Sequence, residues 1–427
     1  MYRHIETDET LGFIMAAGQG DRLRPLTEHR AKPSVPIAGN LRIIDFVLTN
    51  FVRSGLRKNY ITIYYKSDSL SEHIDKNWSF LPKELGEFIK VLPPQKRTDE
   101  EGYGNNANAI FQNIHMIDKH NPKLVAIFAA DHVYYMDVRQ MIEVHDDKDA
   151  DLTICAAPLK VSEIERENGR IPFGVIVTDS DDRVLNFQEK PEHPIEIPNR
   201  KGYIWASMGN YLFKAKELVN TLKEDHEDEK SDHDFGHNII PKMVKEDRKV
   251  FIYDFSTNYI EGMKDHEKGF WMDLGTKDAY YEANMMFRDI TPKLNLYSEW
   301  AIRKPPTKIV FSGSINTEED LEDIKERKGE ALDSIIGIGT IISGATILRS
   351  VIFSHVRIHS YAKVMDSVIL DNVDIGEGCR IKNAVIEKHV QIPKNTQIGY
   401  DIEEDQKKGF TVSTRGIVFV PSGYVFK

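Results

Sequence analysis

Short apolar runs alternate with amphipathic stretches over residues 1–290. The apolar runs are long enough for strands and too short for helices, and they predict strands over residues 11–17, 60–64, 124–130, 152–157 and 173–177. Apolar positions at helical spacing predict helices over residues 45–54 and 216–222. Strands that alternate with helices in this way are typical of an α/β fold with a largely parallel sheet. In such sheets, ligands bind beyond the carboxyl ends of the strands.

Beyond residue 335 the spacing of apolar residues changes. Steps of six residues, joined by three steps of five, connect Ile341, Ile347, Phe353, Ile358, Val364, Ile369, Ile375, Ile381, Ile386, Ile392 and Ile398. This period, bounded by Gly and Asn turns, fits neither a helix nor a hairpin and predicts a parallel β-helix with stacked inward aliphatic side chains. We interpret it as a scaffold or an oligomerisation surface. An acyltransferase is the alternative, although so short a repeat offers little room for an acyl-donor groove.

The two patterns divide the chain into a domain of residues 1–290, a linker of residues 291–334 and a β-helix domain of residues 335–427. Within the linker, residues 302–308 form a proline-containing extended stretch, and residues 318–328 are strongly charged without an apolar face. Another charged run, residues 223–232, is interpreted as a solvated loop.

Composition and charge narrow the function classes. The 427-residue chain is 41% hydrophobic and 10% aromatic, as expected of a globular protein with a sizeable core. Its formal net charge of −11 argues against a nucleic-acid partner, which needs clustered Lys and Arg. No signal peptide precedes the first strand, and no apolar run reaches the roughly 20 residues of a bilayer span, so no membrane partner is expected. The two cysteines, Cys155 and Cys379, lack metal-type spacing and favour a reducing, cytoplasmic setting.

A glycine-containing turn follows the first predicted strand and is a candidate phosphate-binding site. Gly18-Gln19-Gly20 turns the chain directly after that strand. Glycines let backbone N–H groups converge on an anion, and the cations Arg22 and Lys32 follow closely. The segment is therefore a candidate phosphate cradle, with an ordinary tight turn as the alternative.

The wider segment resembles a known family. AAGQGDRL at residues 16–23, AKP at residues 31–33 and LRIIDF at residues 41–46 are similar to motifs of the sugar-1-phosphate nucleotidyltransferases, most closely of the bacterial ADP-glucose pyrophosphorylases. Further motifs follow in the same order along almost the whole chain. The resemblance implies a Rossmann-like nucleotidyltransferase domain with a mostly parallel sheet, then a left-handed parallel β-helix of hexapeptide repeats. It implies that ATP and α-glucose 1-phosphate give ADP-glucose and pyrophosphate, for glycogen or another α-glucan.

Two aspartates in family motifs are the candidate metal ligands. Asp131 follows the predicted strand of residues 124–130, and the resemblance to the family's LAGDHxY includes His132 and Tyr134. Asp273 lies in WMDLGT, similar to the family's WRDVGT. Mg²⁺ takes oxygen ligands, commonly one or two carboxylates with substrate phosphates. The resemblance therefore implies that both aspartates bind Mg²⁺, although an aspartate after a strand also commonly serves as a turn residue or helix cap.

The resemblance also implies roles for the remaining site residues. The expected catalytic residues are Arg22, Lys32 and Asp131, and the expected nucleotide-binding residues are Ala16, Gly18, Gly20, Asn105 and Asn106. FQEKP, SMG and DFG resemble sugar-side motifs and give the expected sugar-phosphate residues, which are Gly174, Glu189, Lys190, Ser207 and Asp234. Lys190 would hold the phosphate of the sugar phosphate, a task suited to a compact point charge. A surface Glu–Lys pair before a turn-forming proline is the alternative for Lys190.

The chain departs from the family at several positions. YGNNANA at residues 103–109 stands where the family commonly has YRGTADA, so Asn105 replaces a loop glycine and Asn108 replaces a carboxylate. Met272 replaces an arginine, and Lys66 stands where many relatives carry glutamine. We therefore expect looser selectivity for ATP than in the family. The alternatives are a pyrophosphorylase for another nucleotide or sugar 1-phosphate and a weakly active regulatory subunit; the retained phosphate and metal residues speak against the latter.

An allosteric anion site and an assembly are implied as well. Arg30 and Arg42 flank the AKP step, and Lys388 lies in the repeat domain where relatives commonly carry a basic residue. The resemblance implies that these groups meet between the domains and bind a phosphorylated metabolite as effector. His29, mostly uncharged at neutral pH, stands where some relatives carry an activator-binding lysine. Ordinary surface positions are the alternative, and a homotetramer is expected.

Overall fold

The computed structural model describes residues 7–16, 18, 20–94, 103–164, 167–309 and 328–426. These residues form two compact units. Unit 1 contains the described residues before position 20 and those of Phe46–Met272, and unit 2 contains Gly20–Asp45 and the described residues from Asp273 onward. The parts of the chain that lie outside the described residues include Ala17, Gln19 and residues 310–327. The last of these contains most of the expected charged linker stretch.

A nine-stranded, mostly parallel sheet forms the centre of unit 1, which confirms the predicted α/β fold. Its main path runs β10 (Val184–Gln188), β9 (Val175–Thr178), β11 (Tyr203–Lys214), β6 (Leu124–Ala129), β1 (Thr10–Ala16), β4 (Lys58–Ile63) and β5 (Phe88–Leu92), and β8 (Leu152–Lys160) and β12 (Val250–Asp254) branch from β11. β1 pairs in parallel with β4 and β6, whereas β11 is antiparallel to β6, β8 and β9. Two short strands, β7 (His132–Val133) and β13 (Met272–Asp273), lie outside this sheet.

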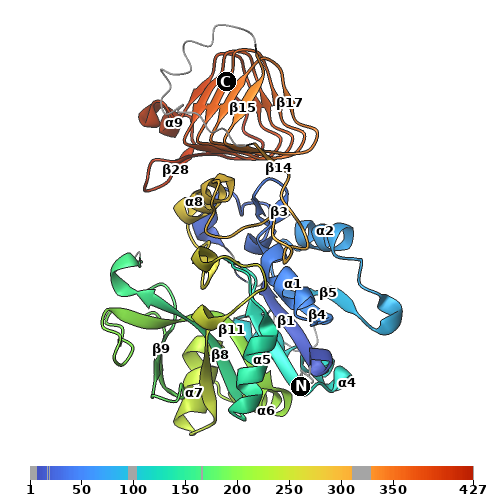
Figure 1. The fold of residues 1–427 in the computed structure, drawn as a ribbon, viewed down its shortest axis with the longest axis vertical. Helices are drawn as coiled ribbons and strands as arrows, with labels where there is room; N and C mark the ends of the chain where they lie inside the picture. The colour runs from blue at the N-terminus through green and yellow to red at the C-terminus, as the bar shows by residue number, and fades with distance from the viewer. Residues whose placement is uncertain are drawn as a thin grey trace. The chain divides into compact units, whose positions relative to one another are not determined.

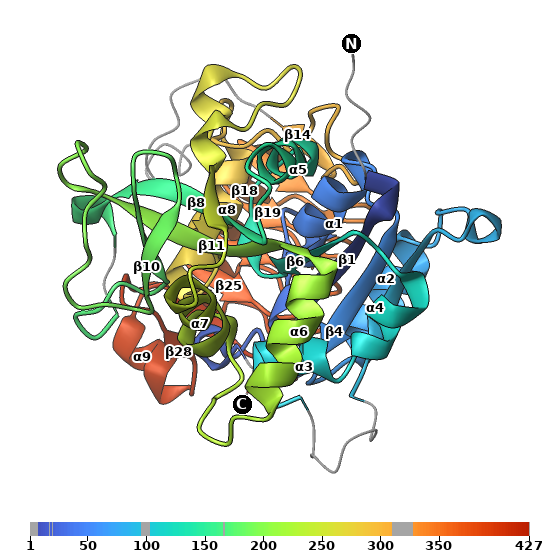
Figure 2. The same ribbon diagram turned by 90° about the horizontal axis from the view of Figure 1, so that it is seen from below.

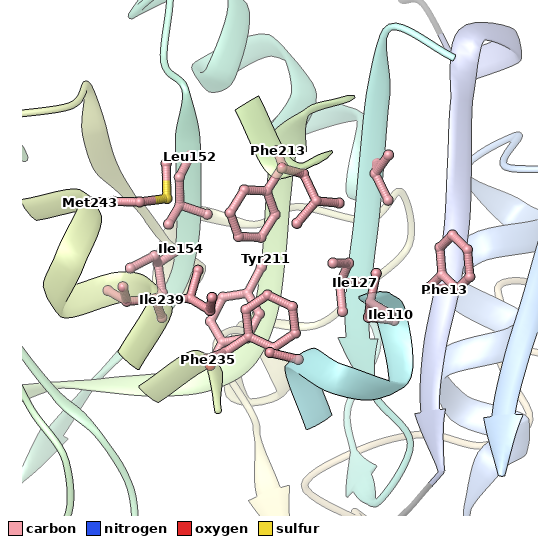
Figure 3. Packing of buried hydrophobic residues seen from close by; sticks show 14 of the residues in the cluster. Phe13, Ile110, Ile127, Leu152, Ile154, Tyr211, Phe213, Phe235, Ile239 and Met243 are labelled. Carbon is pink, nitrogen blue, oxygen red and sulfur yellow. The ribbon is translucent and has the colours of Figure 1, made fainter. Parts of the chain in front are cut away.

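Helices cover the sheet. They are α1 (Ile44–Arg53), which begins at the last residues of unit 2, α2 (Asp68–Asn77), α3 (Asn106–Phe111), α4 (Ile114–His120), α5 (Val138–Asp147), α6 (Ala215–His226) and α7 (Ile240–Lys245). α3, α6 and α7 lie on one face of the sheet (Figure 2). There, Leu152, Ile154 and Phe213 of the strands pack against Ile110 of α3 and Met243 of α7 (Figure 3). This face carries one apolar core of unit 1.

The solvated-loop interpretation of residues 223–232 is wrong for the first part of that run. Residues 223–226 complete α6, which is longer than the predicted helix. Asp225 is only 5% exposed, because Leu218, Leu222 and Asp225 follow one another at helical spacing on the buried face.

The C-terminal part of unit 2 is the predicted parallel β-helix (Figure 1). Its first ladder is β16 (Ser334–Ile336), β19 (Val351–Ile352), β22 (Val368–Ile369), β25 (Ala384–Ile386) and β29 (Val418–Val420), with β14 (Thr307–Ile309) and β28 (Thr411–Val412) as antiparallel ends. Its second is β15 (Glu330–Leu332), β18 (Thr346–Leu348), β21 (Lys363–Met365), β24 (Arg380–Lys382) and β27 (Gln397–Ile398). Its third is β17 (Ile341–Ile342), β20 (Arg357–Ile358), β23 (Asp374–Ile375) and β26 (Gln391–Ile392). Unit 2 also contains β2 (Pro36–Ile37), β3 (Leu41–Arg42), α8 (Lys277–Arg288) and α9 (Ile402–Lys407).

The predicted inward positions are confirmed with two exceptions. Phe353 is buried, but Ile352 takes the place in the β-helix core and pairs with Ile369. The other exception is Ile341. This side chain is 56% exposed, whereas Ile342 packs against the β-helix core and pairs with Ile358. The first coil, from Ile336 to its partner Ile352, is one residue shorter than the next coil. A strict six-residue step therefore places the inward position one residue too early at 341 and one residue too late at 353. None of the helices in the described ranges has both the length and the apolar character of a bilayer span.

Candidate active site

Gly20, in the candidate phosphate cradle, is a position that favours glycine. Its φ of 71° is left-handed, and an added Cβ would lie 3.0 Å from Lys32 Cβ and 3.1 Å from Thr27 Cγ2. Thr27 Oγ1 also donates a hydrogen bond of 2.8 Å to the Gly20 carbonyl. At Gly18, which follows shortly after β1 ends at Ala16, an added Cβ would meet no described atom within 4 Å. Backbone conformation and packing therefore favour glycine at the second position of the turn, whereas the first has open space around it.

Unit 2 brings Arg22, Lys32 and Asp273 together. Lys32 Nζ lies 3.2 Å from Asp273 Oδ1, and the lysine side chain is only 8% exposed. A Cβ added at Gly275 would lie 3.0 Å from Asp273 Oδ2 and 3.4 Å from Arg22 Nη2, so the carboxylate and the guanidinium flank the same glycine. This cluster offers two cations to a bound anion and one carboxylate to a bound cation.

Local interactions around α8 hold this cluster in place. Thr276 is the N-cap of α8, and its side chain accepts a hydrogen bond from Ala279 N. Lys277 Nζ, in the first turn, donates to the Arg22 carbonyl at 3.1 Å. Burial lowers the pKa of Lys277. The threonine of WMDLGT is thus a helix cap, which places Asp273 directly before the helix.

Asp131 lies in unit 1, directly after β6 and the turn residue Ala130. Its Oδ1 is 3.3 Å from His132 Nε2. The His132 ring makes an edge contact with Trp271 at 5.1 Å between centroids, and Trp271 also contacts Phe173. The strand end and this aromatic contact position His132 beside the carboxylate. Asp131 and Asp273 belong to different units, so their joint binding of a metal stays a prediction.

Glu189 connects the predicted sugar-phosphate residues Gly174 and Ser207 to the DFG segment. A Cβ would lie 3.1 Å from Glu189 Oε2 if added at Gly174 and 2.6 Å from it if added at Gly236. The Gly174 carbonyl accepts a hydrogen bond of 2.8 Å from Ser207 N. Burial raises the pKa of Glu189, an effect that the charge of Lys190 partly opposes. Gly236 therefore makes room for this partly desolvated carboxylate, whereas Gly174 makes room chiefly for the Phe187 ring, whose Cζ would lie 2.4 Å from an added Cβ.

Lys190 lies at the rim of this group. Its φ is 45°, and its Nζ is 3.4 Å from Glu189 Oε1. The side chain is 55% exposed, so its ammonium group is accessible to a phosphate. The surface pair of Glu189 and Lys190, which was the alternative interpretation, is present. The pair leaves the Lys190 ammonium at the surface.

Hydrogen bonds to the side chain and the backbone fix Asp234. Its Oδ1 accepts from Gly236 N at 2.8 Å and His237 N at 3.0 Å, which caps the π-helical turn of Phe235–Ile239. Its backbone N donates to Asn238 Oδ1. Its Oδ2 accepts from Asn106 Nδ2 at 2.8 Å. Unit 1 thus joins a predicted nucleotide-binding residue directly to a predicted sugar-binding residue.

The altered YGNNANA loop has its glycine one position earlier than the family. Gly104 has a φ of 59°, which suits glycine, whereas Asn105 has a φ of −99°, which any residue adopts. Asn105 Nδ2 donates to the Asp232 carbonyl at 2.7 Å. Asn108, in place of the family's carboxylate, is only 5% exposed. The replacement of glycine by Asn105 is therefore accommodated without strain.

The three predicted effector residues each have a partner inside unit 2. Arg30 forms a buried bidentate pair with Glu387, and Arg42 Nη1 donates to the Ser34 carbonyl at 2.8 Å. Lys388 Nζ lies 2.7 Å from Asp371 Oδ2. The two acidic partners, Glu387 and Asp371, were missed by the sequence analysis. Neither had a signal in the sequence, because a residue next to an inward position of a coil faces outward, where a carboxylate needs no partner.

Comparisons with known proteins identify the family to which the chain belongs. Residues 11–289 match the nucleotidyl transferase family model, and residues 319–420 match the model described as GlmU-like, C-terminal hexapeptide. The glucose-1-phosphate adenylyltransferase of Thermus thermophilus is 46% identical over 428 residues, which cover 98% of this chain and 99% of the relative. The enzymes of the same name from Rhodopirellula baltica and an Anaeromyxobacter species are 44% and 43% identical, over 97% and 96% of this chain and 90% and 97% of their own length.

The family expected from the motifs is confirmed, as is the order of a nucleotidyltransferase domain before a hexapeptide-repeat β-helix. The chain belongs to the nucleotidyl transferase family and, within it, to the group that contains the glucose-1-phosphate adenylyltransferases.

Proposed function

We propose that this chain transfers the adenylyl group of ATP to glucose 1-phosphate, giving ADP-glucose and pyrophosphate for the synthesis of glycogen or another α-glucan. The observation that carries the proposal is the cluster of Arg22, Lys32 and Asp273 in unit 2. It occurs in a chain that matches adenylyltransferases over nearly its full length. The Arg22 guanidinium and the Lys32 ammonium are the kinds of cation that bind the phosphate groups of a triphosphate.

The reaction needs no covalent intermediate on the protein. A phosphate oxygen of the sugar phosphate attacks the α-phosphorus of ATP in line, the bond from that phosphorus to the bridging oxygen breaks, and pyrophosphate leaves. Such a transfer depends on alignment and on neutralising charge in the transition state. We assign the triphosphate and the leaving pyrophosphate to Arg22 and Lys32, with backbone N–H groups at Gly18 and Gly20.

The remaining roles follow from the motifs and from the contacts within unit 1. Lys190 holds the phosphate of the sugar phosphate, because its ammonium is accessible. We assign the nucleotide to Ala16, Asn105 and Asn106, and the sugar to Gly174, Glu189, Ser207 and Asp234. The fixed Asp234 carboxylate suits the recognition of a sugar hydroxyl, which needs an oriented acceptor.

Asp131 and Asp273 are carboxylates, the oxygen ligands that divalent cations take, and their chemistry fits Mg²⁺. We propose that both residues hold this ion. When bound, Mg²⁺ supplies positive charge against the phosphate oxygens. Lys32, whose Nζ is 3.2 Å from Asp273 Oδ1, orients that carboxylate.

The decisive experiment measures pyrophosphate release over a matrix of nucleoside triphosphates and sugar 1-phosphates. The combination of ATP with glucose 1-phosphate should give the highest kcat/KM. Because of Asn105 and Asn108, we expect ATP to be preferred over UTP, GTP and dTTP by less than about a thousandfold, roughly 4 kcal/mol. A clear preference for another nucleotide or sugar would instead support a pyrophosphorylase of different specificity.

An effector site at Arg30, Arg42 and Lys388 is a separate proposal. A phosphorylated metabolite would have to compete with Glu387 for Arg30 and with Asp371 for Lys388. Such a ligand changes activity only if it binds one conformation of the protein better than another. The coupling free energy between two such sites is typically about 1–3 kcal/mol. Lys388→Ala should abolish stimulation, whereas the exposed Lys394→Ala should keep it. A wild type without any response at saturating and at sub-saturating substrate would disprove the site.

We also propose a cytoplasmic homotetramer and a division into residues 1–290, 291–334 and 335–427. In the β-helix, Ile338 and Ile341 expose 70% and 56% of their surface, an apolar area suited to subunit contact. Light scattering should give four times the chain mass of 49.0 kDa. A monomer at micromolar concentration would contradict the assembly.

A further inference from the structure

The loop of residues 231–234 is anchored from α6 by a buried carboxylate. Asp225, 5% exposed, accepts a hydrogen bond of 2.7 Å from Ser231 Oγ and lies 2.8 Å from His233 Nδ1. Ser231 Oγ in turn accepts from His233 N at 3.0 Å. His233 has a φ of 54°, which these contacts stabilise. The loop therefore has a defined conformation before it reaches Asp234.

The start of α3 holds the same loop from the other side. The His233 carbonyl accepts from Ala107 N at 3.0 Å, and the Asp232 carbonyl accepts from Asn105 Nδ2. The Asn106 amide makes two bonds at once. Its Nδ2 donates to Asp234 Oδ2 at 2.8 Å, and its Oδ1 accepts from Phe235 N at 2.8 Å. The reversed amide would face oxygen with oxygen and nitrogen with nitrogen, so the chemistry fixes its orientation.

The residue after Asp234 is locked into the core. Phe235 is fully buried, and its ring lies 5.4 Å from that of Tyr211 and 5.8 Å from that of Phe213 (Figure 3). The peptide between Asp234 and Phe235 is therefore held by packing on one side and by Asn106 on the other. The orientation of the Asp234 carboxylate depends on both.

We propose that Asn106 is a positioning residue for the sugar substrate, although it lies in the loop assigned to the nucleotide. It acts through Asp234, and the inference rests on the proposed function of that carboxylate. A carboxylate has about four acceptor positions on its two oxygens. Gly236 N and His237 N use Oδ1, and Asn106 uses one position of Oδ2, so Asn106 determines where the remaining acceptor position lies.

The test compares neighbouring asparagines. Asn106→Ala removes the bond to Asp234, whereas Asn105→Ala, the matched control, removes an amide bond to a backbone carbonyl of the same loop. Asn106→Ala should raise KM for the sugar 1-phosphate about tenfold, the usual effect of losing a hydrogen bond to a charged group. KM for the nucleotide should rise less than KM for the sugar 1-phosphate. Asn105→Ala should leave KM for the sugar 1-phosphate within twofold of the wild type.

A conservative variant separates positioning from a general loss of structure. Asn106→Thr keeps a hydroxyl that can donate to Asp234, and it should restore KM for the sugar 1-phosphate to within about threefold of the wild type. The proposal is overturned if Asn106→Ala raises KM for the nucleotide as much as that for the sugar, or changes neither. The assays use whichever substrates the wild type prefers. A wild type inactive with ATP and glucose 1-phosphate thus refutes the proposed function, while the split in KM still decides the role of Asn106.

Discussion

Arg30 and Glu387 form a bidentate ion pair inside unit 2, although 357 positions separate them in the chain. Nη1 to Oε1 is 2.7 Å and Nη2 to Oε2 is 3.0 Å, and the two side chains are only 8% and 2% exposed. Arg30 Nη1 also donates to the Leu26 carbonyl at 3.2 Å. Removing one partner of such a pair leaves the other as a desolvated, unpaired charge.

Glu387→Gln should therefore destabilise unit 2 by about 3–5 kcal/mol, measured by urea denaturation. Glu72→Gln is the control, because it breaks an exposed pair with Lys76 and should cost about 0.5 kcal/mol or less. The double variant Arg30→Met with Glu387→Leu should recover much of the loss. Equal effects of the two single variants would show that the buried pair contributes no more than a surface pair.

His145 predicts a pH-dependent stability of unit 1. Burial lowers its pKa to about 4, the positive charge of Lys214 adds to this, and His145 Nδ1 lies 2.8 Å from Thr153 Oγ1. The folded pKa lies below the unfolded one, about 6.5, so the unfolded chain binds the proton more tightly. Stability is then fully present above pH 6.5 and decreases by up to about 3 kcal/mol as the pH falls towards 4.

The measurement is urea denaturation between pH 4 and 8 for the wild type and His145→Asn. The variant should be less stable at pH 8 and should lose less stability as the pH falls. His193→Gln, at an exposed position, should keep the slope of the wild type. An unchanged slope in His145→Asn would assign the acid sensitivity to other groups.

Asp131→Asn should reduce kcat by at least about a hundredfold, since it removes a charge that stabilises the transition state through the proposed metal. The comparison variant is Asp265→Asn, which removes a carboxylate that is almost fully exposed and should keep normal turnover. Near-normal turnover of Asp131→Asn in Mg²⁺ would rule out the assignment.

Lys190→Ala should raise KM for glucose 1-phosphate far more than KM for ATP, because its contact with the sugar phosphate already exists in the ground state. Lys160→Ala breaks a comparable exposed pair with Glu163 and should change neither constant. If both KM values rise equally in Lys190→Ala, the residue has a structural role.

The local pattern of the sequence was sufficient for most of the fold. β1 spans Thr10–Ala16 and α1 spans Ile44–Arg53, each within one residue of its prediction over the described positions, because apolar spacing directly reflects burial. The prediction for Ile341 was wrong because the first coil is one residue shorter than the next, which moves the inward position to Ile342. Such a change arises from the pairing of distant strands, which a local period does not contain.

The contacts around the site were harder to predict than its residues. Nothing in a single sequence pairs Arg30 with Glu387 or Asn106 with Asp234, because these bonds exist only after distant segments come together. Asp225 is different, since its spacing after Leu218 and Leu222 indicated the buried face of α6. The charged residues around Asp225 favoured a solvated loop over residues 223–232, and that interpretation was wrong for residues 223–226.

The segment Gly20–Asp45 belongs to unit 2, and this has a consequence for protein engineering. A single cut near residue 290 would separate Arg30 from Glu387 and leave a buried guanidinium without its carboxylate. A chimera that takes its β-helix from another enzyme must therefore take residues 20–45 from the same donor. An exchange of the repeat domain that keeps this ion pair therefore involves two pieces of sequence rather than one C-terminal segment.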